Sequence, residues 1–168
     1  MTGTVGAGKS TTIQALSGRL TAAGVSNAAI DADELRLFFP RPPDDPFGVA
    51  VGLANAADVA ARYLSVGVRV LLIADVVEDA ESRAALARAV APAPLSVVRL
   101  DVDEQQLARR LRARESEQTL GWYLERGPVL QAKQRAAALE DVTIAVGQRS
   151  PDELAQQIVR EFGLLADG

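Results

Sequence analysis

The chain has 168 residues, of which 48% are hydrophobic and 24% are charged, and its formal net charge is −4. This length and apolar content predict one compact domain with its own core, and the acidic balance argues against a nucleic-acid surface, which needs clustered cations. The sequence contains no Cys and no His, which excludes disulfides, thiolate metal sites and histidine bases. Acid–base chemistry must therefore fall to carboxylates, Lys, Tyr or bound water.

The first element along the chain is a glycine-rich loop that begins two residues after Met1. Residues 3–10 read Gly-Thr-Val-Gly-Ala-Gly-Lys-Ser, which is the phosphate-binding loop pattern. In this pattern backbone N–H groups and the start of a helix converge on an anionic phosphate. Residues 10–23 carry Ile13, Leu16 and Leu20 at three- and four-residue spacing, which predicts the helix that the motif requires.

The loop predicts most of a nucleotide site for ATP and Mg²⁺. We expect Lys9 to hold the β- and γ-phosphates as a catalytic residue, and Ser10 to bind Mg²⁺. The phosphate contacts are expected from Gly3, Val5, Gly6, Ala7, Gly8, Lys9, Ser10 and Thr11. Only Met1 and Thr2 precede the loop, which is too short for the strand that normally leads into it, and we expect the native chain to begin further upstream.

Short apolar runs then alternate with helical patterns, which is typical of a parallel sheet with crossover helices. We expect strands over residues 27–30, 68–74, 95–102 and 142–146, and helices over residues 50–65, 79–91, 104–114 and 119–139. A last helix is expected to start after Ser150, with Pro151 and Glu153 completing a capping box. The prediction is one three-layer α/β domain over residues 1–168, in which the strand before the loop is central. Without that strand, its two neighbours would lack hydrogen-bond partners.

Two carboxylates, Asp31 and Asp33, follow the first of these strands. They lie where the carboxyl edge of the sheet is expected, which is where α/β folds bind ligands. Phosphoryl transfer uses one carboxylate for Mg²⁺ and another for the attacking hydroxyl. We assign Asp31 to the metal and Asp33 to the acceptor as a catalytic residue; alternatively, Asp33 only caps a helix over residues 34–39.

Further polar side chains follow the later strands. Asp75 ends an apolar strand and is a second metal candidate, with Glu78 as a rival and a simple turn as the alternative. On a helical wheel Arg110 and Arg114 lie beside the buried stripe of Leu107 and Leu111. We expect this arginine pair to be catalytic, closing over the transferred group as part of a lid near residues 110–128; the alternative is a solvated basic face. Arg126, in the next helix, is a further candidate for closing over the substrate.

These motifs together resemble the P-loop small-molecule kinases, most closely the adenylylsulfate kinases and more distantly the chloramphenicol phosphotransferases. The resemblance rests on residues 3–11, residues 31–36, Asn55, the run 110–114 and residues 147–151. It implies a P-loop NTPase fold of the nucleoside-kinase type, in which Asp33, Arg36 and Asn55 contact the acceptor. It also implies that Gly147 and Arg149 line the adenine, with a surface turn as the alternative, whereas Arg110 contacts nucleotide.

The sequence departs from the adenylylsulfate kinases at the acceptor site. Ala32 stands where those enzymes have Gly, and Ala56 and Ala57 stand where they have a basic pair. The acceptor is therefore left open among sulfated nucleotides, nucleosides, antibiotics and sugars.

The expected activity is ATP-dependent transfer of the γ-phosphate to a hydroxyl of a small molecule. The alternative is a module that binds or hydrolyses ATP without such an acceptor. No apolar run approaches the length of a membrane span, so we expect a cytoplasmic protein whose partners are a nucleotide and a small substrate, with neither nucleic acid nor membrane.

Overall fold

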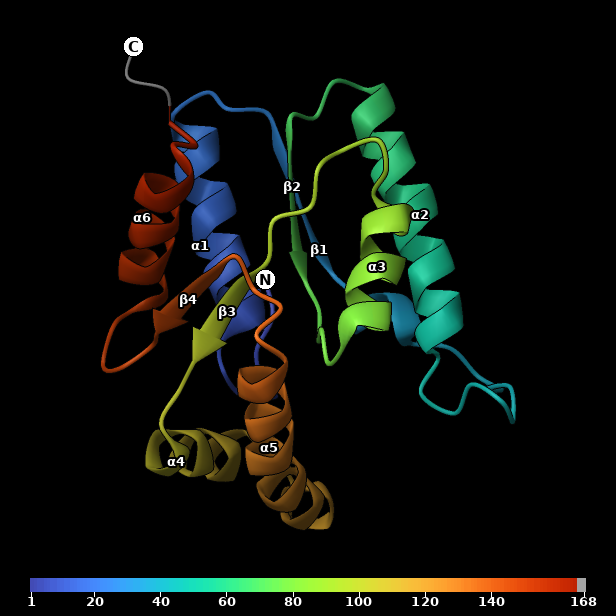
Figure 1. Ribbon diagram of the computed structural model, residues 1–168, viewed down its shortest axis with the longest axis vertical. Helices are drawn as coiled ribbons and strands as arrows, with labels where there is room; N and C mark the ends of the chain where they lie inside the picture. Colours follow the sequence, from blue (N-terminus) through green and yellow to red (C-terminus); the bar gives the residue numbers. More distant parts are fainter. Residues whose placement is uncertain (166–168) are drawn as a thin grey trace.

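The computed structural model describes residues 1–165. In chain order the elements are α1 (Lys9–Ala22), β1 (Asn27–Asp31), the short 3₁₀ helix η1 (Glu34–Arg36), α2 (Val49–Ser65), β2 (Val70–Ala74), α3 (Ala80–Ala89), β3 (Val98–Asp101), α4 (Glu104–Arg114), α5 (Glu117–Ala137), β4 (Val142–Ala145) and α6 (Pro151–Phe162) (Figure 1). Each predicted strand and helix is confirmed; α4 has the predicted bounds and α6 the predicted start, and the other elements begin or end a few residues away from theirs. No helix within residues 1–165 combines the length and apolar content required to span a membrane.

The strands form two parallel pairs, β1 with β2 and β3 with β4. β2 begins at Val70 and β3 at Val98, later than the apolar runs predict. The reason is that a ladder needs a partner residue, and the partner strands begin at Asn27, opposite Val70, and at Val142, opposite Val98.

Met1 and Thr2 lie between the two strand pairs and join them (Figure 1). The Met1 amino group donates to the carbonyl of Ile73 at 2.5 Å, and the amide of Asp75 donates to Met1 at 3.0 Å. On the other side Thr2 is bridged in parallel to Arg99. Met1 and Thr2 therefore lie between the two strand pairs, and the spatial order is β1, β2, Met1–Thr2, β3, β4.

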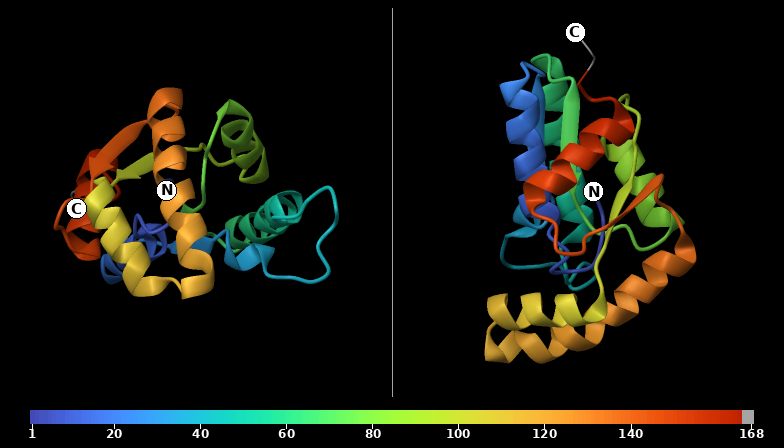
Figure 2. Two further views of the ribbon diagram at one scale, coloured as in Figure 1. Left: turned by 90° about the horizontal axis from the view of Figure 1, so that it is seen from below. Right: turned by 90° about the vertical axis from the view of Figure 1, so that its left-hand side faces the viewer.

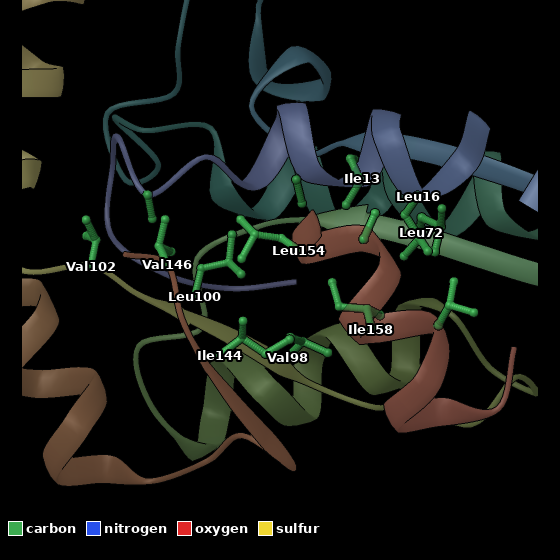
Figure 3. Packing of buried hydrophobic residues seen from close by; sticks show 14 of the residues in the cluster. Ile13, Leu16, Leu72, Val98, Leu100, Val102, Ile144, Val146, Leu154 and Ile158 are labelled. Carbon is green, nitrogen blue, oxygen red and sulfur yellow. The ribbon is translucent and has the colours of Figure 1, made fainter. Parts of the chain in front are cut away.

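Helices cover both faces of this arrangement (Figure 2). Helices α1 and α6 pack together on one face, where the larger core cluster includes Leu16, Leu72 and Ile158 (Figure 3). Helices α2 and α3 cover the other face, where Ile73 meets Leu86. Because neighbouring residues of a strand point to opposite faces, Leu72 and Ile73 enter different clusters.

Helix ends follow local chemistry. Ser150 and Glu153 form the predicted capping box at the start of α6, and Asp79 forms a second one with Ser82 that moves the start of α3 to Ala80.

Helices α4 and α5 form a hairpin beyond the carboxyl ends of the strands, next to the glycine-rich loop (Figures 1 and 2). This edge of the sheet carries the predicted site.

The buried amino group of Met1 should make stability depend on pH. Burial lowers its pKa from 8.0 to about 5, opposed by Asp75 and assisted by Lys9. Between pH 5 and 8 the unfolded amine therefore binds a proton that the folded amine does not, so the free energy of unfolding should rise with pH, by about 1 kcal/mol per pH unit. It should be highest above pH 8 and fall as the pH drops toward 5.

Urea denaturation at several pH values would measure this slope. The sequence has no His, so no side chain with an ordinary pKa titrates near neutrality. A chain acetylated at its N-terminus cannot gain this proton and should show a flat profile. The assignment to Met1 would be wrong if the acetylated chain kept the same slope.

Candidate functional site

The glycine-rich loop adopts a backbone shape that only glycine takes easily. Gly3, Gly6 and Gly8 have φ angles of 144°, 84° and 96°, in the region that residues with a Cβ rarely enter. A Cβ on Gly3 would lie 2.8 Å from the carbonyl oxygen of Leu100. The pattern of glycines thus follows from the curvature of the loop and its close approach to β3.

Helix α1 starts directly from this loop. Gly8 is its N-cap and has no side chain to accept from the first N–H groups, and the first turn carries no acidic residue. The N-terminal end of a helix carries partial positive charge and unpaired N–H donors. The loop and the helix start, with Ser10 and Thr11 in the first turn, therefore offer the donors and the positive charge that would suit the predicted phosphate.

Lys9 places a buried cation inside this loop. Its side chain is largely buried, and its Nζ donates to the carbonyl oxygens of Gly3 at 3.0 Å and Thr4 at 3.3 Å. Burial lowers the pKa of Lys9, and the nearby carboxylates of Asp33, Asp75 and Asp31 oppose that shift. Within residues 1–165 no carboxylate lies within ion-pair distance of this ammonium. A desolvated cation bonded only to carbonyl oxygens is suited to an incoming phosphate.

Two of the predicted metal residues lie at the carboxyl ends of neighbouring strands, Asp31 as the last residue of β1 and Asp75 directly after β2. Asp31 pairs in register with Ala74, the residue before Asp75, so both carboxylates belong to the same edge of the sheet. Within residues 1–165 no group of three or more Asp or Glu side chains converges as a metal cage. A magnesium ion at this edge would rely on one or two carboxylates, Ser10 and phosphate oxygens, which is the usual pattern for Mg²⁺.

Arg36 connects the acceptor candidates to Asp75. Its Nη2 lies 2.6 Å from Asp75 Oδ1, and its Nη1 lies 3.8 Å from Asp33 Oδ1. The Nε of Arg36 is buried without a partner in the described chain. Gly52 of α2 makes room for this side chain, because a Cβ there would lie 2.5 Å from Arg36 Cγ. Sequence reasoning missed both the ion pair with Asp75 and the role of Gly52.

Asp33 itself faces solvent. Its side chain is 71% exposed, and it stands at the N-cap of η1 without accepting a capping hydrogen bond. The helix over residues 34–39 considered as an alternative is only the short turn Glu34–Arg36, since a residue before a proline avoids helical geometry and Pro40 follows Phe39. Asn55 donates to the carbonyl of Leu35 at 2.9 Å and holds this turn against α2.

Solved structures share this arrangement over almost the whole chain. APS kinase of Mycobacterium tuberculosis, in complex with AMPPNP and APS, aligns with a TM-score of 0.62 and 21% identity over 96% of this chain and 94% of its own. The tunicamycin resistance protein of Deinococcus radiodurans aligns with a TM-score of 0.65 and 18% identity, covering 96% of this chain and 92% of that one. Shikimate kinase of Acinetobacter baumannii, in complex with shikimate, aligns with a TM-score of 0.61 and 18% identity, covering 99% of this chain and 93% of its own.

The chain has the fold of the P-loop small-molecule kinases. No family model and no curated protein matches the sequence. The similarity is therefore one of backbone fold.

In this P-loop kinase fold the α4–α5 hairpin carries the predicted lid arginines. Arg110 Nη1 donates to the carbonyl oxygen of Ala7 at 3.1 Å and lies 3.5 Å from that of Gly6. Arg114 is exposed and pairs with Glu115, yet it is close enough to Lys9 to lower the pKa of Lys9 further. Arg126 pairs at 2.8 Å with Glu78, which also binds Lys133. Of the three, only Arg110 touches the loop.

The residues expected near adenine lie beside this hairpin. Gln106 of α4 donates to the carbonyl oxygen of Gly147, and Arg149 donates to Gln157 of α6. A hollow of about 420 Å³ opens here, lined by Gln106, Arg109, Arg110, Ala113 and Gln148. Sequence reasoning missed Gln106, because it belongs to none of the quoted motifs and only the fold brings it beside Gly147 and Gln148.

Proposed function

We propose that this chain is an ATP-dependent phosphotransferase that moves the γ-phosphate of ATP to a hydroxyl group of a small molecule. The single observation that carries the proposal is Lys9, a buried ammonium held by carbonyl oxygens inside a loop at a helix start. A cation without a carboxylate partner is costly to bury. An anionic phosphate at the helix start would offset that cost.

The residues present fit a nucleotide with Mg²⁺. Loop amides and Lys9 would bind the phosphates, and Ser10 with Asp31 would bind the metal, which when bound neutralises developing charge on the phosphate oxygens. Asp75 is a second metal candidate, although one of its oxygens already accepts from Arg36 and from the amide of Val76. Arg110 would turn from the loop carbonyls toward the phosphates, which are stronger acceptors.

Asp33 is the proposed acceptor residue. Its exposed carboxylate is free of a capping bond, and Arg36 is placed to restrain its orientation. We propose that Asp33 accepts the hydroxyl proton as the acceptor oxygen bonds to the γ-phosphorus and the bond from that phosphorus to ADP breaks, so that ADP leaves. Arg36 and Asn55 shape the acceptor side, and Gly147 with Arg149 borders the nucleotide base. Arg114 and Arg126 would join the site only after exchanging their present carboxylate partners.

The test is a transfer assay with ATP labelled at the γ-phosphate, Mg²⁺ and a panel of hydroxyl compounds that includes sulfated nucleotides, nucleosides, sugars and antibiotics. We expect label to appear in one class of acceptor faster than free phosphate is released. Phosphate release that no acceptor changes would instead establish a hydrolase, and binding of ATP without turnover would establish a binding module. Either result would overturn the proposal.

A further inference from the structure

The side chain of Gln106 is buried with its carboxamide only half satisfied. Gln106 lies in the first turn of α4 and is 6% exposed. Its Nε2 donates to the carbonyl oxygen of Gly147, whereas its buried Oε1 accepts from no donor within residues 1–165. A buried acceptor without a donor is costly and rare in folded proteins. A ligand that brings a donor to Oε1 would remove this cost.

The orientation of this carboxamide is fixed by its partner. The carbonyl oxygen of Gly147 can only accept, so the amide nitrogen of Gln106 must face it. The backbone of Gln106 is held as well, because its N–H donates to the side chain of Asp103, the N-cap of α4. A flip of the amide would set two oxygens against each other. Oε1 therefore stays on the side of the carboxamide that is turned away from Gly147.

Gln106 also lines the hollow of about 420 Å³ beside α4, together with Arg110 and Gln148. Arg110 donates to the carbonyl oxygen of Ala7 as well, so a single side chain borders both the hollow and the glycine-rich loop. A nucleotide with its phosphates at the loop would therefore bring its base to the hollow.

The wall of the hollow can adjust to an entering base. Oε1 of Gln106 is covered in the ligand-free chain, so a base reaches it only when lining side chains move. Arg109 and Gln148, which both line the hollow, are exposed to solvent. Exposed side chains change rotamer rapidly, so these two can make way for a base.

We propose that Gln106 selects adenine, by accepting a hydrogen bond at Oε1 from the exocyclic amino group of the base. This rests on the nucleotide site of the proposed function and adds its base specificity. Adenine presents an amino donor where guanine presents a carbonyl oxygen. The guanine oxygen would meet Oε1 as acceptor against acceptor, and both would be left without a donor. Gln106 is thus a specificity-determining residue, separate from the residues that bind the phosphates.

The test measures the binding of ADP, purine riboside diphosphate and GDP by titration calorimetry in the presence of Mg²⁺. Purine riboside diphosphate differs from ADP only in lacking the amino group, so the ratio of their Kd values reports that group alone. We expect ADP to bind at least about tenfold more tightly than purine riboside diphosphate. GDP should bind more weakly still, because its oxygen faces Oε1.

The variant Gln106→Met removes the acceptor and preserves the length of the side chain. Gly147 is exposed, so its carbonyl can bind water in the variant. We expect Gln106→Met to bind ADP and purine riboside diphosphate equally tightly. The matched control is Gln105→Met, the exposed neighbour in the same helix turn, which should keep the original ratio. If Gln106 only held Gly147 in place, its replacement would weaken all three nucleotides by one factor and leave the ratio unchanged.

Two outcomes would overturn this inference and leave the proposed function in place. One is an unchanged ratio in Gln106→Met, and the other is an equal Kd for ADP and purine riboside diphosphate with the original chain. If none of the three nucleotides bound to the original chain, the nucleotide site and both proposals would fall together. The comparison on the original chain does not depend on the folding of a variant, and no measurement requires phosphoryl transfer.

Discussion

Replacement of Lys9 by Met is expected to abolish tight nucleotide binding while making the protein more stable. The ammonium is the buried cation of the loop, and losing a charged hydrogen bond to phosphate costs roughly 1.5–3 kcal/mol, or about 10- to 100-fold in Kd. The same ammonium is desolvated in the ligand-free chain, where its pKa is lowered. An apolar side chain of similar length removes that cost, so the midpoint of denaturation should rise.

Titration calorimetry with a non-hydrolysable ATP analogue and Mg²⁺ would measure the first effect, and urea denaturation the second. The matched control is Lys133→Met, because Lys133 is the other lysine of the chain and forms surface ion pairs with Glu78 and Asp79. This control should bind nucleotide as well as the original chain. If Lys9→Met bound nucleotide as tightly as the original chain, Lys9 would not be a phosphate ligand, and the proposed function would lose its main support.

Replacement of Asp33 by Asn is expected to lower kcat by about 10²- to 10⁴-fold, the range for loss of a general base. Asparagine preserves the shape of the side chain but cannot accept the hydroxyl proton. The side chain is 71% exposed and caps no helix, so folding and nucleotide affinity should remain unchanged.

The matched control for Asp33 is Glu34→Gln, an exposed carboxylate in the same turn. Transfer rates with the acceptor found by the panel, together with calorimetric Kd values for nucleotide, separate chemistry from binding. If Asp33→Asn turned over as fast as the original chain, the base would have to be sought elsewhere, beginning with Asp31, which accepts from the Asp33 amide.

The secondary structure was predictable where local signals are strong. The glycine spacing, the capping box of Ser150 and Glu153, and the apolar runs of the strands each depend on neighbours within a few residues. The first residues of β2 and β3 were less predictable, because a strand begins only where its partner strand offers a residue to pair with. The short turn η1 replaced a longer helix for a local reason, the proline that follows Phe39.

The candidate site was predictable as a set of residues but not as a set of contacts. The ion pair of Arg36 with Asp75 joins residues 39 positions apart, and that of Arg126 with Glu78 joins residues 48 apart. No sequence pattern marks either pair. Equally, nothing in the arginine run distinguishes Arg110, which reaches the loop, from Arg114, which pairs with Glu115.

By itself the sequence determined the phosphate-binding loop, the alternation of strands and helices, and the absence of histidine and cysteine chemistry, because spacing and residue type are local properties. Only the tertiary structure decided that Lys9 is buried with no carboxylate partner among residues 1–165 and that Arg36 bridges Asp33 and Asp75. These features arise where segments distant in sequence meet at one edge of a parallel sheet. The sequence pattern within a segment does not show which side chains of other segments will bury it or pair with it.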